Sequence, residues 1–382
     1  MEFINQSGVE AGWTLGFERD GRELLIVAVK ATYRIPANGE EPVLAAEQAK
    51  LVQADEFTGE PGCSAPLRET DYAPRKPKCD VVLNGSAYAP GGLPARAVEV
   101  SVRVGSMQKM FSVFGDRRWQ GVVLSAEEPE PFTQLPISYD RAYGGADSNE
   151  EQPEKIATYP ENPIGTGYHP IRPRSSLVGK LLPNTAEGKT PITDIKARFR
   201  PMSFGPVGRN FYPRYKLAGT YDDRWLNEEA PFWPADFSYK YFQCAPEDQQ
   251  IEHLQGGEEI ELKNLTPDGL RWFRIPQREM PVTFLHYKGA DVRHDAICDT
   301  LLIEPDQKRF TLTWRISYPL KRNVFEVRQA LVGEMPYSWH SKRRAEHAGK
   351  SYYGSLGDLV NAKRGRLPRA NERKNSIDPF IR

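Results

Sequence analysis

The chain has 382 residues, of which 27% are charged and 39% hydrophobic, and its 51 basic and 51 acidic residues give no net charge. This composition excludes a disordered or membrane-embedded protein, because no apolar run reaches the roughly 18 residues that a spanning helix needs. Four cysteines without a Cys-x-x-Cys pair do not make a disulfide framework, and the N-terminus lacks the apolar stretch of a signal peptide. We therefore expect a cytoplasmic protein of two or three ordinary domains, without membrane insertion.

The first third of the chain has the two-residue period of β-strands. Residues 29–35 alternate between apolar and polar side chains, so that Lys30 and Thr32 share one face. Residues 97–114 contain two further alternating runs around a short turn, which is the pattern of a β-hairpin. These patterns predict an N-terminal β-rich half over residues 1–125.

The middle of the chain, residues 126–250, has a different composition. It holds 16 of the 32 prolines and 18 of the 41 aromatic residues. Proline removes a backbone donor and fixes φ, so regular sheet is not expected here. Aromatic side chains at this density favour burial over solvation. We therefore predict a long irregular segment packed on the β core, with one short helix between Pro246 and Gly256.

The last third returns to β-structure. Residues 310–316 alternate between apolar and polar side chains, which predicts a strand in a C-terminal β-rich half over residues 251–340. From residue 341 the pattern gives way to a basic tail, 341–382, with one short helix expected over 355–363. The predicted fold is therefore mainly β, with two β-sandwich-like or barrel-like halves bridged by the irregular segment and few short helices.

The neutral total hides a charge asymmetry. Residues 341–382 hold eleven Lys or Arg and four Asp or Glu, a net charge of +7, so residues 1–340 carry −7. The body repels polyanions, and aromatic residues that would stack on bases are sparse among the basic clusters of the tail. Nucleic acid is therefore not an expected partner; the tail is either a solvated extension or a docking segment for a protein.

Motifs that would indicate a catalytic or cofactor site fail on inspection. Gly188-Lys189-Thr190 resembles the end of a phosphate-binding loop, but Pro183 stands where that loop needs glycine. His286, His294 and Cys298 have spacings that match no zinc signature. We predict no catalytic residue, cofactor or metal. An enzyme remains an alternative, with a site drawn from Asp71, Asp80, Asp116 or Asp222 together with Arg117 or His286.

Several long motifs rich in Gly, Pro, Asp and Trp are too specific for a generic β protein. They are ETDYAPRKPKCDVV (69–82), GSAYAPGG (85–92), VFGDRRW (113–119), PISYDRAYGG (136–145), NPIGTG (162–167), LPN (182–184), AGTYDDRW (218–225), PADF (234–237) and APEDQQ (245–250). In this order they resemble the bacterial family called domain of unknown function 2169 (DUF2169). The resemblance runs from about residue 14 to about residue 316 and leaves out the basic tail.

The resemblance implies a role in type VI secretion. Proteins of this kind look like effector adaptors, or chaperones, which hold a toxic effector, often one with a PAAR-type domain, and help to load it onto the VgrG spike. It implies no catalytic residues, and it implies the bacterial cytoplasm as location and an effector toxin and VgrG as partners. The alternative role in type VI secretion is that of a structural component of the secretion machine.

Two of these motifs, 69–82 and 218–225, and the aromatic pair just before PADF contain the residues that we expect to line a groove for the partner. Aromatic side chains often dominate the binding energy of protein interfaces. The predicted contact residues are Asp71, Lys76, Asp80, Tyr221, Asp222, Trp225, Phe232 and Trp233. The alternative is that the aspartates cap loops through hydrogen bonds to the backbone and that the aromatic residues pack the irregular segment.

Overall fold

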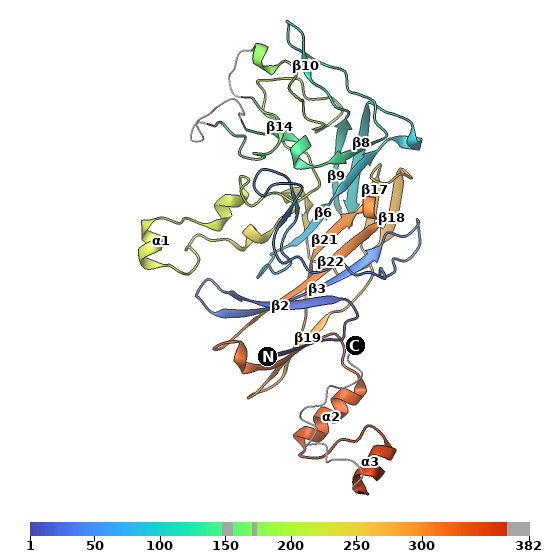
Figure 1. The fold of residues 1–382 in the computed structure, drawn as a ribbon, viewed down its shortest axis with the longest axis vertical. Coiled ribbons are helices and arrows are strands. Elements are labelled where there is room, and N and C mark those ends of the chain that lie inside the picture. Colours follow the sequence, from blue (N-terminus) through green and yellow to red (C-terminus); the bar gives the residue numbers. More distant parts are fainter. Residues whose placement is uncertain (147–155, 170–173, 365–382) are drawn as a thin grey trace.

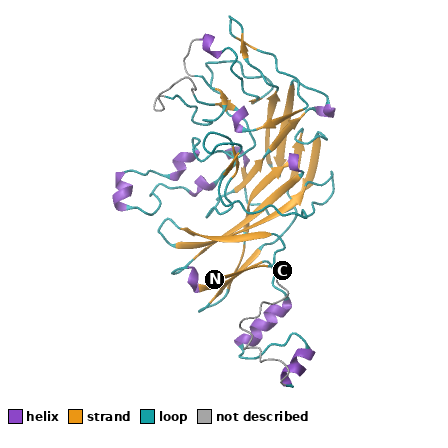
Figure 2. Ribbon diagram, in the orientation of Figure 1, coloured by secondary structure: helices purple, strands orange, loops and turns teal. Residues whose placement is uncertain are grey.

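Three β-sheets form the body of the protein in the computed structural model, which describes residues 1–146, 156–169 and 174–364 (Figures 1 and 2). The largest sheet has six strands, in the order β16 (Gln250–Ile251), β6 (Cys79–Leu83), β21 (Ile297–Glu304), β22 (Arg309–Pro319), β3 (Glu23–Arg34) and β2 (Glu10–Phe17). The second has five, in the order β15 (Thr185–Ala186), β9 (Met107–Phe114), β8 (Ala97–Val104), β17 (Glu259–Lys263) and β18 (Leu270–Arg274). The third has four, in the order β1 (Glu2–Asn5), β23 (Val327–Val332), β19 (Pro281–His286) and β20 (Val292–Asp295).

Strands from the two expected β-rich halves lie in the same sheets. In the six-stranded sheet β3 pairs with β22 in an antiparallel register from Leu24↔Pro319 to Arg34↔Arg309, and β6 pairs in parallel with β21. In the five-stranded sheet β8 pairs with β17. The mainly β fold with few short helices is confirmed, and both large sheets are open sheets of one sandwich. Alternation along a strand predicts which side chains share a face, but it does not identify the partner strand.

One continuous hydrophobic core joins the three sheets. Val27 and Val29 of β3, Val100 of β8 and Phe284 of β19 belong to it and are fully buried. Side chains two residues apart along a strand point to the same face, so each large sheet gives its apolar face to this core. The opposite face of the six-stranded sheet is more polar, and its charged side chains are the starting point for the candidate site.

The middle of the chain is mostly loops and single 3-10 turns. Its aromatic residues form small clusters, as in the edge-to-face contacts that Tyr143 makes with Tyr159 and Phe199 at centroid distances of 5.0 and 5.2 Å. The helix expected after Pro246 is a single 3-10 turn, η7 (Glu247–Gln249), that leads directly into β16. In the described residues, four pairs of short strands lie outside the three sheets: β4 (Glu56–Phe57) with β5 (Pro66–Arg68), β7 (Gly85–Tyr88) with β12 (Gln134–Ile137), β10 (Trp119–Gln120) with β11 (Ser125–Ala126), and β13 (Tyr143–Gly144) with β14 (Thr166–Gly167).

Residues 212–242 leave the body as a projecting arm, at the left of Figure 1. The arm contains the 3-10 turns η5 (Arg214–Ala218) and η6 (Tyr239–Phe242) and the short helix α1 (Asp223–Glu228) near its end. The outgoing and returning chains lie side by side, and the amide of Ser238 donates to the carbonyl of Leu217 at 2.9 Å. The arm is therefore a projection of two chain segments that contact each other along its base.

Two helices follow the four-stranded sheet. The helix expected over 355–363 is present as α3 (Leu356–Lys363), with the hydroxyl of Ser355 accepting from the amide of Asp358. The helix α2 (Tyr337–His347) was not expected from the sequence, although Pro336 before it is typical of a helix start. The end of the basic tail, residues 365–382, lies outside the described residues. In the described part of the chain, every helix is too short or too polar to cross a membrane.

Candidate functional site

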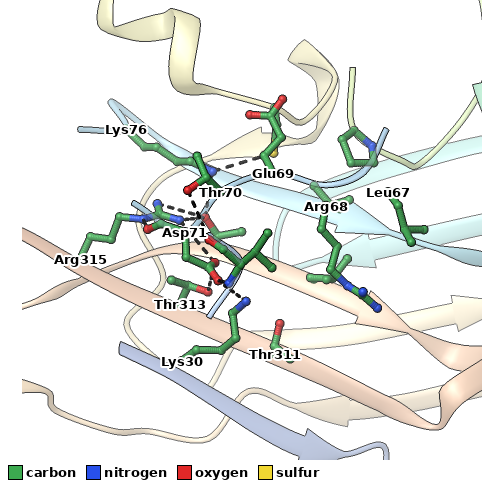
Figure 3. A pocket seen from close by; sticks show the side chains of 16 residues that line it. Lys30, Leu67, Arg68, Glu69, Thr70, Asp71, Lys76, Thr311, Thr313 and Arg315 are labelled. Carbon is green, nitrogen blue, oxygen red and sulfur yellow. Dashed lines mark hydrogen bonds and ion pairs between the residues drawn. The ribbon is translucent and has the colours of Figure 1, made fainter. Parts of the chain in front are cut away.

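The second face of the six-stranded sheet carries a row of charged and hydroxyl side chains. Lys30 from β3, Thr313 and Arg315 from β22, Thr300 from β21 and Asp80 from β6 all lie on it. These are the polar members of the alternating strands. They are not solvated, because residues 52–76 and the chain at the two ends of the arm, around Pro206 and Cys244, cover them. Lys30, Asp80 and Arg315 are 4%, 0% and 5% exposed. Figure 3 shows this covered face from close by.

Asp71 attaches the crossing segment to the sheet. Its carboxylate forms an ion pair with Lys30 and accepts a hydrogen bond from the amide of Val52 at 2.7 Å. Arg315 donates from Nε to the carbonyl oxygen of Asp71 and from Nη1 to the carboxylate of Asp299. Figure 3 shows Asp71 between Lys30 and Arg315. Asp71 therefore neutralises buried cations and is itself inaccessible to a partner, with 5% of its surface exposed.

Asp80 and Lys76 form a second buried ion pair, with 2.6 Å between Oδ2 and Nζ. Asp80 also accepts hydrogen bonds from the amides of Cys244 and Ala245, at 2.9 and 3.1 Å, and from the side-chain amide of Gln243, at 2.7 Å. Burial alone would raise the pKa of Asp80, but the charge of Lys76 and these hydrogen bonds outweigh it and lower the pKa overall. This carboxylate holds the returning end of the irregular segment against β6.

A third group of buried charges fixes the base of the arm. Arg214 donates from Nη2 to Oε2 of Glu69 at 2.7 Å and from Nε to the carbonyl of Tyr241 at 2.9 Å. Arg209 pairs with Asp55 at 2.6 Å and with Glu69 at 3.2 Å. Burial would lower the pKa of Arg214, and the charge of Glu69 reverses this and raises it. The start and the end of the arm are thus both joined to the segment that contains Asp71.

The cavity on the Asp71 side of these charges is too small for a substrate, whereas Lys76, Asp299 and Arg315 also line a second, larger cleft. The cavity beside Asp71 and Lys76 has a volume of about 30 Å³. That volume accommodates a water molecule or two, not a metabolite or a peptide side chain. Three cations (Lys30, Lys76, Arg315) face three carboxylates (Asp71, Asp80, Asp299), so the charges compensate one another. Buried pairs of this kind specify how segments dock.

The residues of the enzymatic alternative are dispersed. Asp116 accepts from Arg141 and Asn184, and the neighbouring Arg117 is buried and donates to the carbonyls of Pro183 and Ile192. His286 lies on β19 and contacts Tyr318, while Asp71 and Asp80 lie under the crossing segments and Asp222 lies on the arm. Of these six residues, the small cavity beside Lys76 contains only Asp71 in its lining. A roomier cleft of about 280 Å³ opens beside β20 and the end of β22 and contains His253, His294 and Tyr318.

The other five predicted contact residues lie together on the arm. Asp222 is the N-cap of α1 and accepts from the amide of Trp225 at 2.8 Å, which is the capping role considered as the alternative. The indole of Trp225 donates to the carbonyl of Phe232 at 2.8 Å, and its ring meets that of Tyr221 edge-on at 4.7 Å. These contacts give the end of the arm its shape.

Trp233 organises the middle of the arm. Its half-buried ring contacts Phe237, Tyr239 and Phe242 at centroid distances of 4.2, 5.9 and 5.9 Å. The hydroxyl of Tyr239 also donates to Glu18, at the turn between β2 and β3. The arm is therefore pinned by aromatic packing at its root, and Trp233 acts mainly inside the arm.

The end of the arm exposes three apolar side chains that are close in sequence, and Tyr212 and Tyr215 are exposed at its start. Tyr221, Leu226 and Phe232 are 55%, 63% and 47% exposed. One edge of Phe232 lies over Gly21, where an added Cβ would come within 2.2 Å of the ring, so the turn between β2 and β3 needs glycine for this contact. Exposed apolar residues on a fixed projection are typical of a protein-binding surface.

Sequence reasoning missed most of the buried network and one arm residue. Lys30 and Arg315 stand out only as charges inside otherwise apolar strands, and this signal indicates a covered polar face. Leu226 follows directly after the AGTYDDRW motif and has no signal of its own. Asp71, Lys76 and Asp80, expected on a surface groove, lie buried because residues 52–76 and the chain around Pro206 and Cys244 cover the sheet.

Fold and site together define a β-sandwich protein with a charge network buried under irregular segments and an aromatic arm anchored to that network. The chain belongs to a bacterial family: the family described as "Uncharacterized protein conserved in bacteria (DUF2169)" matches residues 20–315. That range includes both large sheets' central strands, the covered charges and the whole arm. Searches of curated proteins and of solved structures found no match.

Proposed function

We propose that this protein is a non-catalytic adaptor, or chaperone, that binds a type VI secretion effector and promotes its loading onto the VgrG spike. The observation that carries the proposal is the arm, which exposes Tyr221, Leu226 and Phe232 while its root is fixed to the body. An apolar surface that is already fixed in its binding geometry loses little conformational entropy when a partner binds. The family resemblance is what supports an effector as the partner.

The buried network has a supporting role in this proposal. Arg214 and Glu69 join the arm to the segment that Asp71 attaches to the six-stranded sheet. The arm's position therefore depends on the same ion pairs that hold the irregular segment in place. An adaptor needs such a rigid mount, because an interface that moves freely loses conformational entropy on binding.

The test is co-expression with the effector-like protein encoded beside this gene, with its toxic activity removed by mutation. The proposal predicts one complex in size-exclusion chromatography and an effector that is poorly soluble when expressed alone. A matched control replaces this protein with its Tyr221→Ala/Leu226→Ala variant. An effector that folds, and loads onto VgrG, without this protein would contradict the proposal. Stoichiometric copies in the assembled secretion particle would instead identify a structural component.

A further inference from the structure

The end of the arm, residues 220–236, combines its apolar patch with a strong local charge. We call this segment the arm tip. It contains one basic residue and five acidic ones, a net charge of −4: Asp222, Asp223, Arg224, Glu228, Glu229 and Asp236. Apart from Glu229, which is partly buried, these charged side chains are exposed. The exposed side chains of Tyr221, Leu226 and Phe232 lie in the same segment.

Only some of these carboxylates have a structural task. Asp222 caps α1, Glu229 accepts from the amide of Ala235 at 2.7 Å, and Asp236 accepts from the amide and the hydroxyl of Thr220. Asp223 and Glu228 lie at the two ends of α1, and Glu228 pairs with Arg224 through an exposed contact at 3.1 Å. An exposed pair of this kind adds little to stability, so the acidity of the helix is not needed for folding.

We propose that the arm tip docks on a basic protein surface, with Tyr221, Leu226 and Phe232 against an apolar site that lysine or arginine residues surround. This rests on the proposed function and specifies the chemistry of the partner at the contact. Complementary charge at the rim of an interface accelerates encounter and excludes other partners, while the apolar centre supplies most of the affinity. Residues 1–340 as a whole carry −7, so the body strengthens the same attraction.

The sign of the charge excludes anionic occupants of this exposed apolar patch. Anionic lipid surfaces and nucleic acids would be repelled by a tip of charge −4. The acidic body of a second copy would be repelled in the same way, but its basic tail, 341–382, would not. A dimer that the wild type forms and the variant Asp223→Lys/Glu228→Lys does not form, measured by analytical ultracentrifugation, would identify that tail as the occupant and overturn the inference. A basic protein surface is the occupant that both the apolar patch and the acidic rim favour.

The experiment reverses the two acids of α1 that have no task in the fold. Affinity for the inactivated effector encoded beside this gene is measured for the wild type and for Asp223→Lys/Glu228→Lys. The matched control, Glu40→Lys/Glu41→Lys, makes the same charge change in an exposed loop that adjoins β18, on the opposite side of the body from the arm (Figure 1). The proposal predicts an affinity at least about tenfold lower for the arm variant and a change of less than about twofold for the control.

Two further readouts locate the contact. Raising the salt concentration from about 0.05 to 0.5 M should weaken the wild-type complex and have less effect on the arm variant. Carbodiimide coupling, which joins carboxylates to neighbouring amines, should link peptides of residues 220–236 to lysines of the effector. Equal binding by both variants, with links outside the arm, would overturn this inference and leave the adaptor function intact. Absence of any wild-type complex would overturn both.

Discussion

Asp80 and Asp222 stand in similar Asp-containing motifs, yet they occupy opposite settings. Asp80 is completely buried, pairs with Lys76 and accepts three further hydrogen bonds from residues 243–245. Asp222 is exposed on the arm and accepts one hydrogen bond at the start of α1. The comparison separates two regions. The covered network determines how the irregular segment lies on the sheet. The arm presents exposed side chains whose removal should leave the stability of the fold nearly unchanged.

The largest effect on stability is expected from removing the carboxylate of Asp80. Asp80→Ala leaves Lys76 buried without its counter-charge and three donors without an acceptor. We expect a loss of about 3–5 kcal/mol in the free energy of unfolding, a large part of the stability of an ordinary domain. Urea unfolding measures it, and Glu47→Ala, at an exposed acidic residue, is the control with an unchanged midpoint. A small effect at Asp80 would mean that the network does not hold the segment.

Acid should act on the same network. The pKa of Asp80 lies below that of an unfolded aspartate because Lys76 and the backbone donors overcome its burial. Its stabilising contribution is therefore complete above about pH 4 and is lost as the pH falls through the folded-state pKa. Unfolding free energies measured between pH 7 and pH 3 should fall more steeply for the wild type than for Asp80→Asn. Parallel curves would contradict this assignment.

A substitution of Trp233 tests whether this side chain stabilises the arm alone or also the main core. Trp233→Ala removes the ring that packs on Phe237, Tyr239 and Phe242, and we expect a cost of about 2 kcal/mol because the ring is only half buried. The loss should be concentrated in the arm, as faster hydrogen exchange of residues 212–242. Trp233→Phe should restore most of it. Exchange that rises equally throughout the β-sandwich would place Trp233 in the main core.

The smallest expected effect on stability comes from the exposed arm residues. Tyr221→Ala/Leu226→Ala should leave the melting temperature nearly unchanged, since both side chains are more than half exposed. The same variant should lower the affinity for the effector at least about tenfold, because exposed apolar anchors dominate binding energy. Phe325→Ala, at another exposed aromatic residue on the body, is the control for both measurements.

The sequence predicted the strands and the aromatic packing better than the site. The alternation of residues 29–35 and 310–316 predicts β3 and β22, since a two-residue period has no other common cause. It does not show that Lys30 and Arg315 lie on a covered face, because burial depends on segments far away in the chain. For the same reason Asp71, Lys76 and Asp80 could be taken for surface residues. The arm's residues were found as a motif, while their exposure follows only from the projection of residues 212–242.

The central claim is that the covered network maintains the fold and that the arm binds the partner. The most direct test measures the affinity of Tyr221→Ala/Leu226→Ala for the inactivated effector together with its unfolding midpoint. The account predicts a fully folded protein with the wild-type midpoint and an affinity at least about tenfold lower. Wild-type affinity in this folded variant would contradict it and would place the partner on another surface of the β-sandwich.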